Sequence, residues 1–183
     1  LHDNKPIVSA DLPAGVVQGI YSDVADVALY SISAPATTLT AAPTLAANAL
    51  PVGSCIGITA RGYVRDNTGG ANFEFIVKLA STNVVTTTIP NSTPTTDTTN
   101  RPFVFEALLT CRTTGGSGSV MGQYTAVFVN QNLGISFSGH GGSVTTSAVT
   151  IDTTTTQVVD VLAGADINDA DTGLTFTNSL IEY

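Results

Sequence analysis

Apolar and polar residues alternate along most of the chain after residue 27, which is the pattern of strands that bury one face. Helical periodicity is weak: the segment Val16–Tyr30 could form a short helix, but Gly19 and its valines disfavour one. We predict strands at Val27–Ser33, Ser54–Val64, Ala71–Ala80, Val84–Ile89, Arg101–Arg112, Val120–Asn130, Gly134–Ser138, Ser143–Ile151, Gln157–Leu162 and Leu174–Glu182.

The segments between these strands are rich in Gly, Pro, Asn and Asp, as in "RDNTGG", "PNSTPTTDTTN" and "TTGGSGS". These residues favour turns because they adopt or stabilise the required backbone angles. Short strands separated by turn signals indicate a sandwich, and long, unequal connections favour a jelly roll over simple hairpins. The sequence therefore predicts an all-β protein, a single antiparallel β-sandwich of jelly-roll type.

The N-terminal segment, Leu1–Asp26, has a different character, with two prolines and no clean alternation. We predict an extended arm over residues 1–26, ordered against a partner or the flank of the domain, and a jelly-roll domain over residues 27–183. The alternative is an ordinary edge strand at Pro6–Pro13.

The strand Ser54–Val64 has two different faces. Ile56 and Ile58 lie on the face that we expect to line the core. Arg61 and Tyr63 lie on the opposite face, where they form either ordinary solvated surface or a subunit contact, since Arg and Tyr are enriched at interfaces.

The two cysteines fall on opposite faces of their predicted strands. Cys111 shares a face with apolar residues, whereas Cys55 points outward. A disulfide would need a bulge or a strand that changes sheet, so the pattern favours two free thiols over a disulfide. Neither cysteine has a neighbouring His or Lys that would activate it.

The low charge of the chain excludes several classes of function. Only 11% of the residues are charged, with six Lys plus Arg and a net charge of −8. A nucleic-acid binder or a protein that docks on anionic membranes needs a cationic surface, so we expect neither partner. The strand carboxylates Glu74, Glu106 and Glu182 lie on separate segments and no nucleophile motif is present, so we expect a non-enzymatic protein.

The segment "ADINDADTG" brings four oxygen-bearing side chains into one predicted loop: Asp166, Asn168, Asp169 and Asp171. Such a density of oxygen ligands can bind calcium, although the spacing is not that of an EF-hand. The alternative is a polar turn whose side chains bond their own backbone. Calcium is thus a candidate metal, and we expect no other cofactor.

Several segments resemble single jelly-roll virion proteins of tailed phages. "TLAANALPVGSCIGITARGYV" is similar to a turn and first long strand of the pattern "IPANTL-VG" and "I-I-A-G". "ANFEFIVKLASTNVVTTT" resembles the next hairpin, and "RPFVFEALLTCRTTGGSGSVMGQ" the long strand and Gly-Ser turn that follow. The closing segment from "VTIDTTTTQVV" to Tyr183 resembles the family ending, without its tryptophan. The resemblance covers Leu39–Tyr183.

The resemblance implies a structural protein on the exterior of a phage virion. Members of this group occur as head-decoration (cement) proteins and as tail-fibre or baseplate domains, and they are typically trimers. We therefore expect a homotrimeric capsid decoration protein whose partner is the major capsid protein or another virion protein. A tail-fibre, baseplate or glycan-binding receptor-recognition module is the alternative.

Overall fold

The computed structural model describes residues 19–23, 26–30, 35–38, 41–67, 70–90, 97–130, 136–140, 148–167 and 169–183. Within these ranges the chain forms strands and turns, and no helix occurs. The strands are β1 (Gly19–Asp23), β2 (Val27–Tyr30), β3 (Ala36–Thr37), β4 (Thr44–Leu45), β5 (Cys55–Asp66), β6 (Asn72–Leu79), β7 (Thr82–Pro90), β8 (Asp97–Thr113), β9 (Gly118–Asn130), β10 (Ser136–His140), β11 (Val149–Ile151), β12 (Gln157–Ala165) and β13 (Gly173–Glu182).

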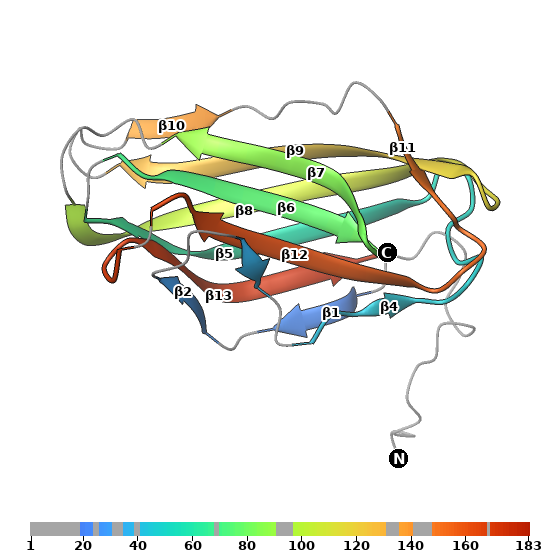
Figure 1. Cartoon of the computed structure of the whole chain (residues 1–183), viewed down its shortest axis with the longest axis horizontal. Coiled ribbons are helices and arrows are strands. Elements are labelled where there is room, and N and C mark those ends of the chain that lie inside the picture. The colour runs from blue at the N-terminus through green and yellow to red at the C-terminus, as the bar shows by residue number, and fades with distance from the viewer. Residues whose placement is uncertain are drawn as a thin grey trace, which may run out of the picture.

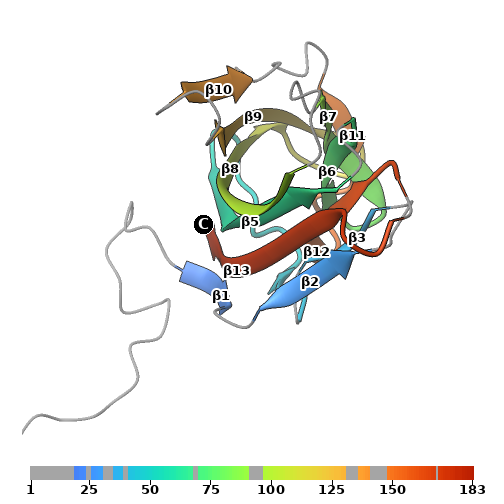
Figure 2. The ribbon, with the colours of Figure 1, turned by 90° about the vertical axis from the view of Figure 1, so that its left-hand side faces the viewer.

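These strands form two antiparallel sheets that lie face to face (Figure 1). In the described part of the chain the larger sheet has eight strands in the order β1-β13-β5-β8-β9-β10, with β2 also paired to β13 and β11 to β9. The smaller sheet, counted over the same residues, has five strands in the order β3-β12-β6-β7, with β4 also paired to β12. Seen end-on, both sheets curve around a shared interior (Figure 2).

The chain repeatedly crosses from one sheet to the other. It does so between β5 and β6, between β7 and β8, and between β12 and β13. β5 pairs with β13 in the larger sheet, and their neighbours along the chain, β6 and β12, pair in the smaller sheet. Paired strands that continue together into the opposite sheet are typical of jelly rolls. The predicted all-β sandwich is confirmed.

The long strands agree with the sequence prediction, apart from shifts at their ends. β12 continues past the predicted end at Leu162, because Ala163 and Ala165 still pair with Phe75 and Phe73 of β6. The prediction omits β1, β3 and β4. β3 and β4 have two residues each, which is too short for an alternating pattern to be recognised.

The predicted arm, Leu1–Asp26, falls largely outside the described residues. The described portion includes β1, which pairs antiparallel with β13 from Gly19 opposite Glu182 to Asp23 opposite Ser179. Gly19–Asp23 is therefore part of the larger sheet, where an arm was expected. The alternative edge strand at Pro6–Pro13 lies outside the described residues, and the division at residue 26 stays a prediction.

A cluster of phenylalanines joins the two sheets. Phe75 of β6 is completely buried and stacks on Phe105 of β8, with ring centroids 4.7 Å apart and an angle of 7° between the planes. Phe103, Phe128 and Phe176 of the larger sheet surround it with their rings tilted or edge-on, at centroid distances of 5.8 to 6.3 Å. These are favourable aromatic geometries, and each ring also removes a large apolar area from water.

A glycine allows β13 to lie close to β5 at a bulge. A Cβ atom at Gly62 would lie only 1.8 Å from the carbonyl oxygen of Thr175. The β5–β13 register shifts next to this contact, between Phe176 and Asn178. Gly62 thus sets the path of β13, whose far end carries Glu182 to the outer face of the larger sheet.

We predict that Phe75→Ala lowers the free energy of unfolding by about 3–5 kcal/mol, because it leaves a cavity among four other rings. Val158→Ala, at a side chain that is 39% exposed, should change it by about 0.5 kcal/mol or less. Urea unfolding followed by circular dichroism measures both. Equal effects of the two substitutions would contradict the central role of Phe75.

Candidate functional site: the outer face of the larger sheet

Four neighbouring strands, β13, β5, β8 and β9, present one continuous surface, which we call the outer face. Every second residue of β5 from Ile56 to Asp66 is buried, so the residues between them point outward. The pairing register aligns the outward residues in rows across the sheet. Successive rows are Glu182–Gly57–Leu108–Gln123, Leu180–Thr59–Glu106–Thr125 and Asn178–Arg61–Val104–Val127.

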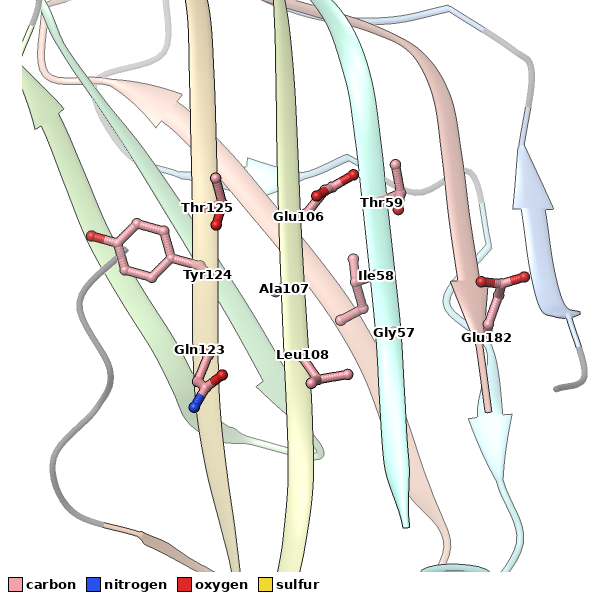
Figure 3. Close-up of a pocket in the computed structure, with 10 residues that line it drawn as sticks. All are labelled: Gly57, Ile58, Thr59, Glu106, Ala107, Leu108, Gln123, Tyr124, Thr125 and Glu182. Atoms are coloured by element: carbon pink, nitrogen blue, oxygen red, sulfur yellow. The ribbon is translucent and has the colours of Figure 1, made fainter. Parts of the chain in front are cut away.

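A hollow of about 470 Å³ lies on the outer face around Gly57. Gly57 forms part of its floor, and a Cβ atom there would meet no other atom within 4 Å. Figure 3 shows the lining residues, which come from four strands: Gly57, Ile58, Thr59, Glu106, Ala107, Leu108, Gln123, Tyr124, Thr125 and Glu182. The hollow thus exists because a residue without a side chain stands among residues with longer ones.

Two carboxylates flank the hollow from different strands. Glu106 on β8 and Glu182 on β13 lie on either side of β5, which runs between those strands (Figure 3). Gln123, Thr59 and Thr125 add amide and hydroxyl groups. The arrangement can accept hydrogen bonds from a cation or from the hydroxyl groups of a ligand.

Tyr124 lines the hollow but its ring belongs to the interior. The ring stacks with Phe105 at a centroid distance of 6.2 Å, and its hydroxyl oxygen accepts a hydrogen bond of 2.6 Å from Thr87 of the smaller sheet. The ring and the hydroxyl group of Tyr124 therefore both take part in the contact between the sheets. A ligand in the hollow would meet the aliphatic side chain of Leu108 rather than an aromatic platform.

The outer face also carries exposed apolar and cationic side chains. Tyr63 and Leu108 are each 42% exposed, and they lie three rows apart on this face. Arg61 is exposed, and among the described residues its guanidinium has no ion-pair partner. The structure therefore brings Arg61 and Tyr63, the residues singled out from sequence, to the same face as the hollow.

The hollow itself is not predicted from the sequence. Glu106 and Glu182 fall on separate predicted strands, and nothing in their spacing shows that β8 and β13 both pair with β5. One feature of the sequence does indicate an indentation on this face. Gly57 shares the outward parity of Arg61, and a glycine at an outward position of a long strand leaves an indentation.

The side chains of the loop that suggested calcium form polar contacts with several different partners. Asp166 accepts hydrogen bonds from the backbone and side-chain nitrogens of Asn72 at 2.8 and 2.6 Å. Asp169 accepts bonds from the Asp171 backbone and the Thr172 hydroxyl, and Asp171 lies 3.3 Å from the guanidinium of Arg65.

No group of three His, Cys, Asp or Glu side chains suited to a metal occurs within the described ranges. Asn168 lies outside those ranges. Asp169 bonds within the loop, as in the polar turn that was the alternative interpretation, whereas Asp166 and Asp171 contact residues of other strands. Calcium binding by this loop stays a prediction.

We predict that Asp166→Ala destabilises the fold by about 1 kcal/mol, because it removes both hydrogen bonds that the side chain of Asp166 accepts from Asn72 at the start of β6. The loss should be the same in millimolar calcium and in a chelator, and urea unfolding in both solutions measures it. A loss seen only in calcium would instead identify a metal site.

The two cysteines are free, as predicted. Cys55 is exposed on the outer face, with its Sγ 3.6 Å from the hydroxyl of Thr110. Cys111 is buried and donates a hydrogen bond of 3.4 Å to the carbonyl of Leu50. Burial raises the pKa of the Cys111 thiol above its ordinary value, which disfavours the reactive thiolate.

We predict that a Cys55→Ser variant gains no adduct when the native protein is treated with a maleimide, and one adduct after unfolding in guanidinium. Cys111 is the remaining thiol in that variant, and it is buried. Intact-mass spectrometry measures the adduct. Rapid labelling of the native variant would contradict the buried position of Cys111.

No family model matches this chain, and no curated protein matches it. Among solved structures it is similar to the CBM2 module of Lactobacillus casei BL23 phage J-1 evolved Dit. The identity is 12%, the match covers 81% of this chain and 74% of that chain, and the TM-score is 0.38. A similarity this low assigns neither a family nor a function.

Within the described residues, no helix has the length and apolar character needed to cross a membrane.

Proposed function

We propose that this chain is a non-enzymatic structural protein of a phage virion, which associates with copies of itself through the outer face of the larger sheet. The observation that carries the proposal is the composition of that face. Leu108 and Tyr63 are exposed there, and Gly, Thr, Asn, Gln, Val and Leu outnumber the charged residues Arg61, Glu106 and Glu182 in its three central rows. Exposed apolar groups on a sparsely charged surface favour burial against another protein. The sequence resemblance to phage jelly-roll proteins supports the same role.

The assembly that we propose is a homotrimer that decorates the exterior of the capsid, with the major capsid protein or another virion protein as its partner. A decoration protein that binds the assembled shell and not loose subunits stabilises the shell by mass action. Permanent assemblies of this kind bury about 2,000 Å² or more in each interface. Neither nucleic acid nor a lipid surface is part of the proposal, because the net charge is −8.

We predict that the purified chain has three times its mass of 18.7 kDa in solution, as measured by light scattering on a sizing column. Leu108→Glu should give a monomer, because it places a third carboxylate beside Glu106 and Glu182 within the buried contact. Val158→Glu is the matched control: Val158 is 39% exposed, against 42% for Leu108, but lies on the smaller sheet.

Either of two results would contradict the proposal. One is a monomeric parent protein. The other is a trimer that Val158→Glu dissociates while Leu108→Glu does not, since the contact would then lie on the smaller sheet.

The capsid location has a separate test. Gold-labelled antibodies against the chain, viewed by electron microscopy on particles of the encoding phage, should decorate the head. Label confined to the tail would replace head decoration with the tail-fibre or baseplate role.

The hollow favours a second candidate function, the binding of a glycan by a receptor-recognition module. Its carboxylate, amide and hydroxyl groups could bond sugar hydroxyls, whereas the chain has no tryptophan and Tyr124 is turned inward. A glycan array would identify such a ligand, and Gln123→Ala should abolish the signal. The absence of any signal at millimolar ligand would remove this candidate.

A further inference from the structure

The hollow poses an electrostatic problem for any assembly that buries the outer face. Glu106 and Glu182 both line it, and among the described residues neither has an ion-pair partner. Removing two carboxylates from water without a compensating charge costs several kcal/mol each. A stable contact over this face therefore needs a cation that enters the hollow.

Few cations of the chain are free to do so, since it has only six Lys plus Arg. Arg65 pairs with Asp171, and Arg101 is buried. Lys78 lies on the smaller sheet, opposite Asp160 of β12. Lys5 lies outside the described residues. Among the described residues Arg61 and Arg112 remain, and both are exposed.

Arg61 has the better position of the two. It lies on the same outward side of β5 as Gly57, two rows away, which is about 13 Å along the strand. It lies one row from Thr59 and Glu106, which also line the hollow. Arg112 lies at the far end of β8, beside the turn into β9. A partner that packs on the face can bury a residue near its middle, whereas a residue at the end of a strand can stay in water.

Arg61 and Glu106 lie in adjacent rows but form no ion pair within one copy, so the guanidinium of Arg61 can pair with a neighbouring copy. One face carries an exposed guanidinium at one place and an anionic hollow at another, so two copies offset along the strands are complementary in charge. When each copy gives one patch to one neighbour and receives the other patch from a second neighbour, the contact is heterologous and closes into a ring if the rotation permits. A closed trimer would fill all of its hollows in this way.

We propose that the hollow around Gly57 receives the guanidinium of Arg61 from a neighbouring copy, where it pairs with Glu106 and Glu182. Arg presents five N–H donors, and the carboxylates, together with Gln123, offer enough acceptors for them. The absence of a side chain at Gly57 leaves the room that the guanidinium needs. This inference rests on the proposed self-association of the outer face.

The first test measures the dissociation constant of the assembly by sedimentation at decreasing concentration. Arg61→Gln and Glu106→Gln should each weaken association at least about tenfold, as expected for one partner of a buried charged pair. Lys78→Gln is the matched control, because it removes the same charge from the smaller sheet and should leave association unchanged. Arg112→Gln should also leave it unchanged.

The second test detects the contact directly by disulfide formation. In a Cys55→Ser background, copies with Arg61→Cys are mixed with copies carrying Gln123→Cys, which lines the hollow. Oxidation should join the two kinds of copy into covalent dimers. Copies with Lys78→Cys in place of Arg61→Cys serve as the control and should not be joined.

The outcomes separate this inference from the function on which it rests. A monomeric parent protein would overturn both. A stable trimer that Arg61→Gln does not weaken and that forms no crosslink would overturn the inference alone. If Arg112→Gln weakened association more than Arg61→Gln, Arg112 and not Arg61 would be the residue that enters the hollow. If a saccharide bound in the hollow without affecting association, the hollow would be a glycan-binding site and the inference would be wrong.

Discussion

The packing of Phe75 against the phenylalanines of the larger sheet is the contact on which the rest of the molecule depends. Phe75 comes from β6, and the rings around it come from β8, β9 and β13, so one cluster fixes both sheets relative to each other. Because side chains alternate along a strand, the residues that join this cluster also decide which residues face outward. Phe105 points inward, and its neighbour Glu106 must therefore point to the outer face.

The outer face follows from this constraint together with one bulge. Gly62 lets β13 approach β5, and the register shift beside it determines that Glu182 lies opposite Gly57. A shift of one residue would exchange the two faces of β13 and remove Glu182 from the hollow. The carboxylates that flank Gly57 are thus placed by packing far from them, which explains how an indented, anionic site arises on a sheet with few charges.

The sequence was sufficient for the long strands and for the direction of their side chains. Ile56 and Ile58 are buried, Arg61 and Tyr63 point outward, and Cys111 is buried while Cys55 is exposed. Alternation has a period of two and is visible in one segment at a time, which is why these features could be predicted. β3 and β4 are too short to show it, and β12 extends through small residues that carry little signal.

The hollow could not be predicted because it depends on which strands are neighbours. Glu106 and Glu182 are far apart in the chain, and they approach the same glycine only because β8 and β13 both pair with β5. The calcium loop shows the reverse case, in which residues close in sequence engage different partners: Asn72 for Asp166 and Arg65 for Asp171. Proximity along the chain predicted a common site there, and the side chains point to separate contacts.

The central claim is that copies of this chain cover the outer face of the larger sheet. Hydroxyl-radical footprinting over a dilution series would test it most directly, because it reports the exposure of individual side chains in the unmodified protein. The account predicts that Tyr63 and Leu108 are protected at high concentration and become reactive on dilution, while Val52 and Val158 react equally throughout. Equal reactivity of all four side chains at every concentration would contradict it.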